Sequence, residues 1–489
     1  MKKTVLGKLV ILTLIMSMII IPFGSSSALG QYNVSQNTLR VALGLDQPSG
    51  EFTVLEGEYE LIDYQTQRII SPSVTGMVGS WLCAPAGGAG LQISNSSAGI
   101  QELGGTTILL RQKNINGQNI FRYKNKRYRG DLLLQNVNGR LQVINIIDIE
   151  QYLYGVVGDE IGYTAPLEAL KAQAVVSRTY ALYYKQNPQL HYDLGITTSW
   201  QIYGGYDSEL QAGGQVKTAV DTTRGQVITY QGKPIQAFFH ANAGGYTEAC
   251  ENVWWDCLPY IQPVPSPQDS YALQHSQSNG WPASTYQWER TFTLAELNNR
   301  IAKWNNANPS DAIRIGSLQR LQASRFAVNP VTKEFMKTET ASRRVTQLDF
   351  IGTSGVKSFT KNKARSVLDL PSTLFEIFND SVVAIWNAFG NLDFHNDASQ
   401  IIAVARGGYK TKLNGENGHY YVIGADGLKQ VPKKSDTITI KGRGSGHGLG
   451  MSQWGARGMA SQGSNYQQII LYYYNQGKND GTIQITTYQ

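Results

Sequence analysis

Short runs of alternating apolar and polar residues dominate the first part of the chain. Residues 38–43 have the composition of a strand, and residues 127–134 and 140–144 form two more runs on either side of Asn138-Gly139. That dipeptide favours the two-residue turn of a β-hairpin. Residues 29–147 are therefore predicted to form a β-rich N-terminal part.

From residue 148 the pattern becomes helical. Asp148, with Gln151 three positions later, resembles the start of a short helix. Residues 158–162 are expected to be a glycine-flanked loop that carries Glu160. A long helix follows from near Thr164, rich in alanine and without glycine from residue 165 to residue 186. Small side chains allow close packing on both sides, so this helix is predicted to lie centrally.

The rest of the pattern is mixed. It predicts strands over 216–265, a helix over 292–305, a strand over 346–351, a helix over 361–370 and hairpins within 377–437. The fold class is therefore α+β, with mixed β-sheets around the central alanine-rich helix and an inserted lobe. Residues 148–290 are expected to form the catalytic core with the Glu160 loop. Residues 291–437 are the additional lobe, and residues 438–489 complete the core.

The first 28 residues have the pattern of a signal peptide. Three lysines precede an apolar run over residues 9–23, and Ser26-Ser27-Ala28 offers small residues for cleavage. The run is short for a membrane span. The protein is therefore expected to be exported to the periplasm or cell wall, or to be membrane-anchored if the leader stays uncleaved.

The charge is mildly basic. The net charge is +7, and about +4 remains without the leader lysines, which favours attraction to an anionic wall or membrane surface. No nucleic-acid-binding motif accompanies this charge, so a nucleic-acid partner is not expected. The 27 tyrosines fit either a surface that stacks on sugar rings or a β-rich fold.

The three cysteines allow two arrangements. Cys250 and Cys257 are close enough in sequence for a disulfide, which an oxidising compartment permits. The alternative is a metal site that combines both thiols with His240, although the spacing does not match a standard zinc pattern.

Glu160 is the first candidate for chemistry. It follows Val156 and Val157 and precedes Ile161. A carboxyl packed against such apolar walls has its pKa raised, and it then keeps the proton that a general acid must donate. The alternative is an ordinary solvated loop residue.

Two further blocks place histidine beside glycine. Residues 238–247 carry His240 ahead of a Gly-Gly turn, and residues 441–456 carry glycine at every second position around His447. Alternating glycines let a backbone approach another group closely. The second block lacks the Gly-Lys-Ser/Thr of a phosphate loop. A capped structural histidine and a structural turn are the alternatives.

Together these blocks resemble the stage II sporulation protein D family, also called SpoIID/LytB. The similarity is carried by residues 152–160, 168–181, 239–247 and 446–453, in that order, and extends over about residues 38 to 475. The resemblance implies a lytic transglycosylase that cuts peptidoglycan glycan strands at the β-1,4 bond between N-acetylmuramic acid and N-acetylglucosamine, leaving 1,6-anhydro ends. Some members are instead described as modifiers of amidases, which makes a non-catalytic, glycan-binding modulator of a cell-wall amidase the alternative.

The resemblance also implies roles for individual residues. Glu160 is expected to be the catalytic acid and base, with no cofactor and no metal. Seven residues are expected to bind substrate: Arg178, Tyr180, His240, Tyr260, His447, Ser452 and Gln453. For Arg178 the alternative is a structural ion pair with Glu160 or Asp159. Gln262 and Trp454 depart from the lysine and tyrosine that are common in relatives.

The leader gives the first testable prediction. If residues 1–28 are a cleaved signal peptide, the exported protein begins near residue 29, and N-terminal sequencing of secreted material checks this. Exported protein that still begins with Met1 would reject cleavage and favour a membrane anchor.

Overall fold

The computed structural model describes residues 37–187, 191–211, 213–254, 256–275, 283–378 and 437–488. Between these last two ranges it describes short stretches that form the hairpins β24 (Val383–Trp386) with β25 (Leu392–His395), β26 (Ile402–Val404) with β27 (Lys410–Lys412), and β28 (His419–Gly424) with β29 (Gly427–Pro432). The expected leader, residues 1–28, lies outside the described residues. None of the described helices is long and apolar enough to cross a membrane.

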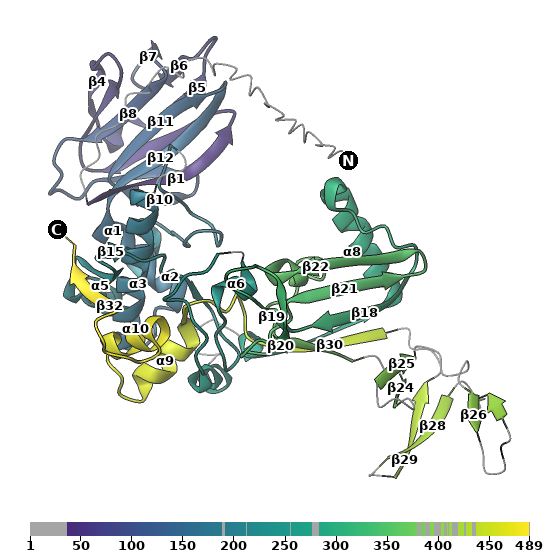
Figure 1. Ribbon diagram of the computed structural model, residues 1–489. Coiled ribbons are helices and arrows are strands. Elements are labelled where there is room, and N and C mark those ends of the chain that lie inside the picture. Colours follow the sequence, from purple (N-terminus) through teal and green to yellow (C-terminus); the bar gives the residue numbers. More distant parts are fainter. Residues whose placement is uncertain are drawn as a thin grey trace, which may run out of the picture.

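Two β-sheets form the N-terminal part (Figure 1). One has seven strands in the order β13 (Leu194–Gly195), β1 (Thr38–Gln47), β12 (Arg140–Asp148), β11 (Asp131–Val137), β8 (Thr107–Gln112), β3 (Tyr59–Asp63) and β4 (Arg68–Val74). The other has six, in the order β10 (Lys126–Arg129), β9 (Ile120–Tyr123), β2 (Gly50–Glu56), β5 (Ser80–Pro85), β6 (Leu91–Asn95) and β7 (Ile100–Gly104). The hairpin expected at Asn138-Gly139 joins β11 to β12, and both residues have the positive φ that this turn requires.

Helices follow directly from the last long strand. The side chain of Asp148 accepts hydrogen bonds from the backbone N–H groups of Glu150 and Gln151, and so it caps α1 (Ile149–Tyr154), as the sequence predicts. The central helix α3 (Leu167–Gln186) is buried over most of its length, including all its alanines. It is surrounded by α1, α2 (Val157–Ile161), α5 (Gly213–Thr222), α9 (Gln453–Ser461) and α10 (Tyr466–Asn475).

The C-terminal segment returns to this core, as the yellow helices beside α3 show in Figure 1. β31 (Met451–Ser452) pairs in parallel with β16 (Phe239–His240). The last strand, β32 (Ile483–Thr487), joins the sheet formed by β14 (Gln226–Tyr230) and β15 (Lys233–Pro234). Segments that are far apart in sequence therefore share one hydrophobic core with the two N-terminal sheets.

A second lobe has its own hydrophobic core. It contains a three-stranded sheet of β17 (Gln287–Thr293), β30 (Thr437–Arg443) and β23 (Phe375–Phe378), and another of β18 (Leu318–Ser324), β21 (Gln347–Gly352) and β22 (Gly355–Thr360). The helix α8 (Leu294–Ala307) begins at a capping box of Thr293 and Glu296. The pair β19 (Phe326–Val328) and β20 (Phe335–Glu339) completes this lobe.

Some predicted elements are wrong. Part of the segment expected as strands over 216–265 is helical: it contains the end of α5 and the short helix α6 (Cys250–Val253). The α5 helix buries Val216, Ala219 and Val220 on one face, a helical spacing that the sequence reading missed. The helix expected over 361–370 is a short 3₁₀ turn, Lys361–Arg365, without a side-chain cap from Thr360. The other helical elements that the structure describes are α4 (Tyr206–Gln211), α7 (Ala272–His275) and the 3₁₀ turns Gly76–Val78, Pro267–Tyr271, Ala283–Thr285 and Pro309–Asp311.

A substitution at Gly450 tests how closely the segment of β31 must approach β16. Its φ is +67°, and an added Cβ would lie 2.0 Å from the carbonyl oxygen of Phe238. Gly450→Ala is expected to lower the free energy of unfolding by at least about 2 kcal/mol, because β31 must move off β16. Urea unfolding measures this.

Gly463→Ala is the matched control. Gly463 also has a positive φ, +94°, but nothing lies within 4 Å of its added Cβ. Only the backbone strain remains, at about 1 kcal/mol. Equal unfolding midpoints for the two variants would contradict the close approach at Gly450.

Candidate active site

Glu160 lies on a short helix and not on the predicted loop. In α2 the backbone N–H of Glu160 donates to the carbonyl of Val156 at 3.0 Å, and the N–H of Gly162 donates to that of Gly158 at 2.9 Å. Gly158 has no room for a side chain, because an added Cβ would lie 2.2 Å from the ring of Tyr163. The glycines that favoured a loop instead allow this helix to pack tightly.

The carboxyl of Glu160 is almost completely enclosed. Its residue is 8% exposed. Oε1 accepts a hydrogen bond from the backbone N–H of Ile202 at 2.6 Å, and Oε2 accepts one from Nε2 of Gln453 at 3.3 Å. Burial raises the pKa of Glu160 to about 7, although both hydrogen bonds act to lower it. The carboxyl therefore holds a proton over much of the neutral range, as a general acid must.

A buried polar network holds these two donors in place. Nε2 of Gln453 also donates to Oε1 of Gln173 at 3.5 Å, and Nε2 of Gln173 donates to the hydroxyl of Ser177 at 2.9 Å. Gln201, next to Ile202, accepts from the hydroxyl of Tyr152 at 3.1 Å and donates to the carbonyl of Ser177 at 3.3 Å. Both hydrogen-bond partners of Glu160 are thus fixed against the same turn of α3.

Gln453 therefore holds the carboxyl of Glu160 by a hydrogen bond, and its own residue is only 2% exposed. This burial does not support the direct substrate contact expected of Gln453, which stays a prediction. The contact that the structure shows holds the carboxyl of Glu160 in place. The neighbouring acid, Asp159, is bonded elsewhere: it accepts from Ser208 at 2.6 Å and from the hydroxyl of Tyr163.

Aromatic rings extend away from this site along one connected row. Tyr180 packs against Tyr184 at a ring-centroid distance of 4.7 Å, and Tyr184 against Trp200 at 5.0 Å. Burial raises the pKa of Tyr180, and the nearby charge of Glu160 contributes to the same shift. The half-buried members of the row, called the aromatic strip below, are Tyr184, Trp200, Phe238, Phe239 and Trp254.

The two histidines that the sequence singled out lie together. The rings of His240 and His447 are 5.5 Å apart, and His447 also packs against Trp254 at 5.0 Å. Burial lowers the pKa of His447 to about 3 and the pKa of His240 well below its usual range. Both rings are therefore neutral. His240 is only 4% exposed, so its expected contact with substrate is not supported by its position, whereas half-buried His447 borders the aromatic strip.

Ser452 has a structural position. It is fully buried, caps α9 by accepting from the N–H of Gly455 at 3.2 Å, and donates to Asp269 at 2.5 Å. Because the side chain is fully buried, its position does not support the predicted role in substrate binding, which stays a prediction. Asp269, whose pKa burial raises to about 6, also accepts from the N–H of Gly245 at 3.0 Å. No sequence motif pointed to Asp269.

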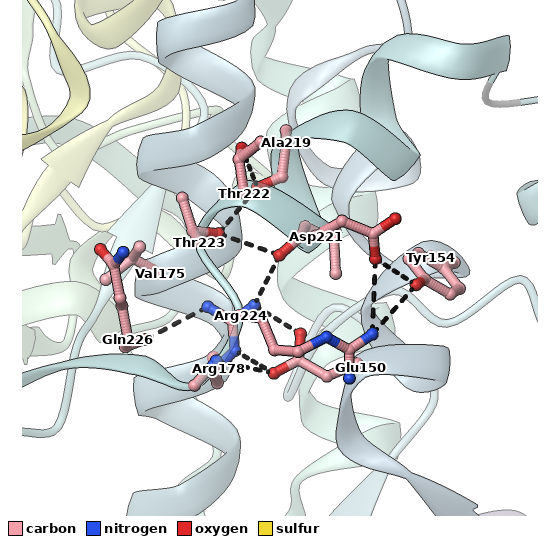
Figure 2. A network of polar contacts seen from close by, with 12 residues as sticks. Glu150, Tyr154, Val175, Arg178, Ala219, Asp221, Thr222, Thr223, Arg224 and Gln226 are labelled. Atoms are coloured by element: carbon pink, nitrogen blue, oxygen red, sulfur yellow. Dashed lines mark hydrogen bonds and ion pairs between the residues drawn. The ribbon is translucent and has the colours of Figure 1, made fainter. Parts of the chain in front are cut away.

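Arg178 is also a structural residue. Figure 2 shows its guanidinium against Glu150, with contacts of 2.8 and 2.6 Å, and against the carbonyl of Gln226. Arg178 is 1% exposed. This buried position does not support the predicted sugar contact, which stays a prediction. The alternative of a structural ion pair is right in kind, but the partner is Glu150 and not Glu160 or Asp159.

Tyr260 is linked to Tyr184 of the aromatic strip through Gln236, and none of the described contacts joins it to Glu160. It is 8% exposed, packs against Tyr230 at 5.7 Å and accepts a hydrogen bond from the N–H of Gln236 at 3.2 Å. Burial raises its pKa to about 12, so the phenol is neutral. Its role towards substrate stays a prediction.

All three cysteines are free thiols: Cys83 and Cys250 are buried and Cys257 is exposed. The disulfide considered for Cys250 and Cys257 is not formed in the structure. Within the described ranges, no group of three or more His, Cys, Asp or Glu side chains is arranged to hold a metal ion.

The sequence of this chain is similar to those of several known proteins. Residues 137–230 match the SpoIID model, described as stage II sporulation protein. The stage II sporulation protein D of Bacillus subtilis (strain 168) is 27% identical over 349 residues, which cover 68% of this chain and 74% of that protein. The amidase enhancer of the same organism is 27% identical over 326 residues, 66% of this chain and 39% of that protein. An uncharacterized protein of Brachyspira hyodysenteriae is 27% identical over 354 residues, 71% of each chain.

The raised pKa of Glu160 predicts a stability effect. The folded carboxyl keeps its proton up to about pH 7, whereas the unfolded one loses it near 4.5. Between these values unfolding releases a proton, so the free energy of unfolding falls as pH rises. Glu160→Gln removes this cost and is expected to be more stable than wild type at pH 8 by up to about 3 kcal/mol.

Near pH 4.5 most of this advantage disappears, because wild-type Glu160 is then protonated in the folded state and about half protonated in the unfolded state. Urea unfolding of both proteins at pH 4.5 and pH 8 measures the difference. An advantage that is the same at both pH values would show that Glu160 does not have a raised pKa.

Proposed function

Starting from the membership of this chain in the SpoIID family, we propose that it is a peptidoglycan lytic transglycosylase with Glu160 as its acid and base. The observation that carries the proposal is the enclosed carboxyl of Glu160, with a pKa of about 7 and a hydrogen bond to each oxygen. The substrate is the β-1,4 bond between N-acetylmuramic acid and N-acetylglucosamine.

In the first step, protonated Glu160 donates its proton to the glycosidic oxygen. The bond between that oxygen and C1 of N-acetylmuramic acid then breaks, and N-acetylglucosamine leaves with a free 4-hydroxyl. The N–H of Ile202 and the amide of Gln453 stabilise the carboxylate that remains. The same two donors that hold the acid thus prepare it to act as a base.

In the second step, the Glu160 carboxylate takes the proton of the muramic C6 hydroxyl. The C6 oxygen bonds to C1 and closes the 1,6-anhydro ring, so no water is consumed and Glu160 regains its proton. Most glycosidases need a second carboxylate to activate water or to form a covalent adduct. Here Asp159 is bonded to Tyr163 and Ser208, which fits a mechanism with a single carboxylate.

The aromatic strip is the part of the surface that suits the sugars. Flat faces of Tyr184, Trp200 and Trp254 can stack on pyranose rings while their polar edges hydrogen-bond. Tyr180 packs against Tyr184 of this strip and lies near enough to Glu160 for that charge to act on its pKa, so the strip and the acid are neighbours.

The expected leader bears on where the reaction takes place. We propose that the protein is exported and acts in the periplasm or cell wall, on the evidence of residues 1–28 alone. Peptidoglycan glycan strands are then its partner.

The amidase-enhancer relative favours one second candidate. That protein is named for an effect on an amidase, and 66% of this chain aligns with it. Under this reading the chain binds glycan through the aromatic strip and stimulates a cell-wall amidase without cutting. The release of anhydro-ended fragments separates the two functions, because only a transglycosylase forms such ends.

Glu160→Gln tests the proposed chemistry. The substitution keeps the size of the side chain and an acceptor for the N–H of Ile202, but it cannot donate and recover a proton. Anhydro-muropeptide release from purified sacculi is expected to fall by about 10²–10⁴-fold, as mass spectrometry of the soluble products would show. Binding of glycan is expected to persist.

Glu168→Gln is the matched control in the same region. Glu168 is part-exposed, pairs with Lys171 and accepts from the N–H of Tyr466, a bond that glutamine can still accept. Its activity is expected to stay near the wild-type level. Glu160→Gln that cuts as fast as wild type would refute the assignment. If the wild type releases no anhydro ends but stimulates an amidase, the second candidate replaces the first.

A further inference from the structure

A groove lies where the second lobe meets the core. It encloses about 780 Å³, a volume in the range of sites that hold a small ligand or a short peptide. Gly244, Gly245 and Tyr246 of the core line one end. The rest, called the lobe groove below, is lined by side chains of β17, β23 and β30, by Arg325 and by residues 341–343.

The floor of the lobe groove is one face of the three-stranded sheet. Gln287 pairs with Arg443 and Glu289 with Lys441, so these four side chains lie on the same face. The opposite face carries Trp288 and Phe375, which are buried in the lobe core. The groove therefore lies over a rigid, packed support.

Positive charge exceeds negative charge along this groove. The lining cations are Arg325, Arg343, Lys441 and Arg443, and the lining acids are Glu289 and Glu376. Lys441 pairs with Glu289 at 3.1 Å. Arg343 approaches Glu339 only at 3.6 Å, with both side chains more than half exposed, so this pair leaves most of its charge available.

Two guanidinium groups have no acidic partner among the residues that the structure describes. Arg325 donates to the carbonyls of Arg343 at 3.0 Å and Phe375 at 2.8 Å, which fixes its position without neutralising it. Arg443 is exposed on the groove floor and forms no ion pair in the described part of the chain. Arg325, fixed by two carbonyls, and Arg443, without an ion pair in the described part of the chain, lie in one groove. Guanidinium groups arranged in this way can bind carboxylates.

The lobe groove is connected to Glu160 through the backbone. Strand β30 ends at Arg443, and the chain continues through the glycine block to Gln453, which bonds Glu160. At the start of that path, Ser445 and Asn242 exchange backbone hydrogen bonds, at 2.8 and 3.1 Å. A ligand in the lobe groove therefore contacts a segment that continues directly into the active site.

We propose that the lobe groove binds carboxylate groups of peptidoglycan, away from the bond that is cut. This rests on the proposed function, because the ligand is taken from its substrate. N-acetylglucosamine is neutral and gives the arginines no partner. Carboxylates occur in the stem peptide and, once that peptide is removed, on the lactyl group of N-acetylmuramic acid. The lobe groove thus binds the anionic groups of the peptidoglycan, while the aromatic strip binds its sugar rings.

The test uses a ligand that the enzyme cannot cut. A single disaccharide of N-acetylglucosamine linked to N-acetylmuramic acid lacks the scissile bond, so its binding is measured separately from catalysis. Isothermal titration compares this disaccharide with and without its stem peptide on the full-length protein. Arg443→Gln is expected to weaken binding by about two- to five-fold, and Arg443→Glu by more, with both effects shrinking in high salt.

Arg122 provides the matched control. It is an exposed arginine in the middle of β9, far from the groove in sequence and absent from its lining. Arg122→Gln and Arg122→Glu change the net charge by the same amounts as the Arg443 variants and are expected to leave binding unchanged.

The outcomes separate the two sources of carboxylate. Weakening only for the peptide-bearing disaccharide assigns the groove to the stem peptide, and weakening only for the bare disaccharide assigns it to the lactyl carboxylate. Weakening of both alike means that the groove accepts a carboxylate from either source. The proposal is overturned if Arg443 variants bind both ligands like wild type, or if Arg122 variants lose as much. Failure of the proposed transglycosylase would appear separately, as the absence of anhydro ends from sacculi.

Discussion

The structure depends on one buried contact, in which the carboxyl of Glu160 meets the N–H of Ile202 and the amide of Gln453. These three residues come from α2, from the loop after β13 and from the first turn of α9, so the contact exists only when the whole core is assembled. Burial of an ionisable group costs stability above its pKa, and the surrounding network of Gln173, Ser177 and Gln201 offsets part of that cost by keeping both donors in place. Burial of the Glu160 carboxyl therefore both lowers the stability of the fold above pH 7 and raises the pKa that the proposed chemistry needs.

Backbone proximity is what allows the C-terminal segment to reach this contact. Added Cβ atoms at Gly444, Gly446 and Gly450 would each lie within 2.8 Å of atoms in the segment that carries His240. The alternating glycines therefore serve protein packing rather than ligand binding, and the two neutral histidines beside them lie ring to ring at 5.5 Å. The block delivers Gln453 to the acid, and β30, which precedes it, supplies the floor of the lobe groove.

The sequence predicted those parts of the site that local pattern encodes. Apolar neighbours indicated a raised pKa for Glu160, alanine content placed α3 at the centre, and Asn138-Gly139 located a hairpin. It failed where the role of a residue depends on which segment packs against it. The position of Arg178 in a motif does not reveal that Glu150 lies opposite, and Ile202 contributes a backbone N–H that no side-chain pattern can mark. Asp269 lies in a segment without any motif and acquires its role from its contacts with Ser452 and Gly245.

The central claim is that a protonated Glu160 starts the reaction, and the most direct measurement is the titration of this one carboxyl beside the activity it controls. Infrared difference spectra between wild type and Glu160→Gln, recorded from pH 4 to pH 9, isolate the Glu160 band, and release of anhydro-ended fragments is followed over the same range. The account predicts a carboxyl midpoint of about 7, with the rate of release falling as the proton is lost. A midpoint near 4.5, or a release rate that stays constant while the carboxyl ionises, would contradict it.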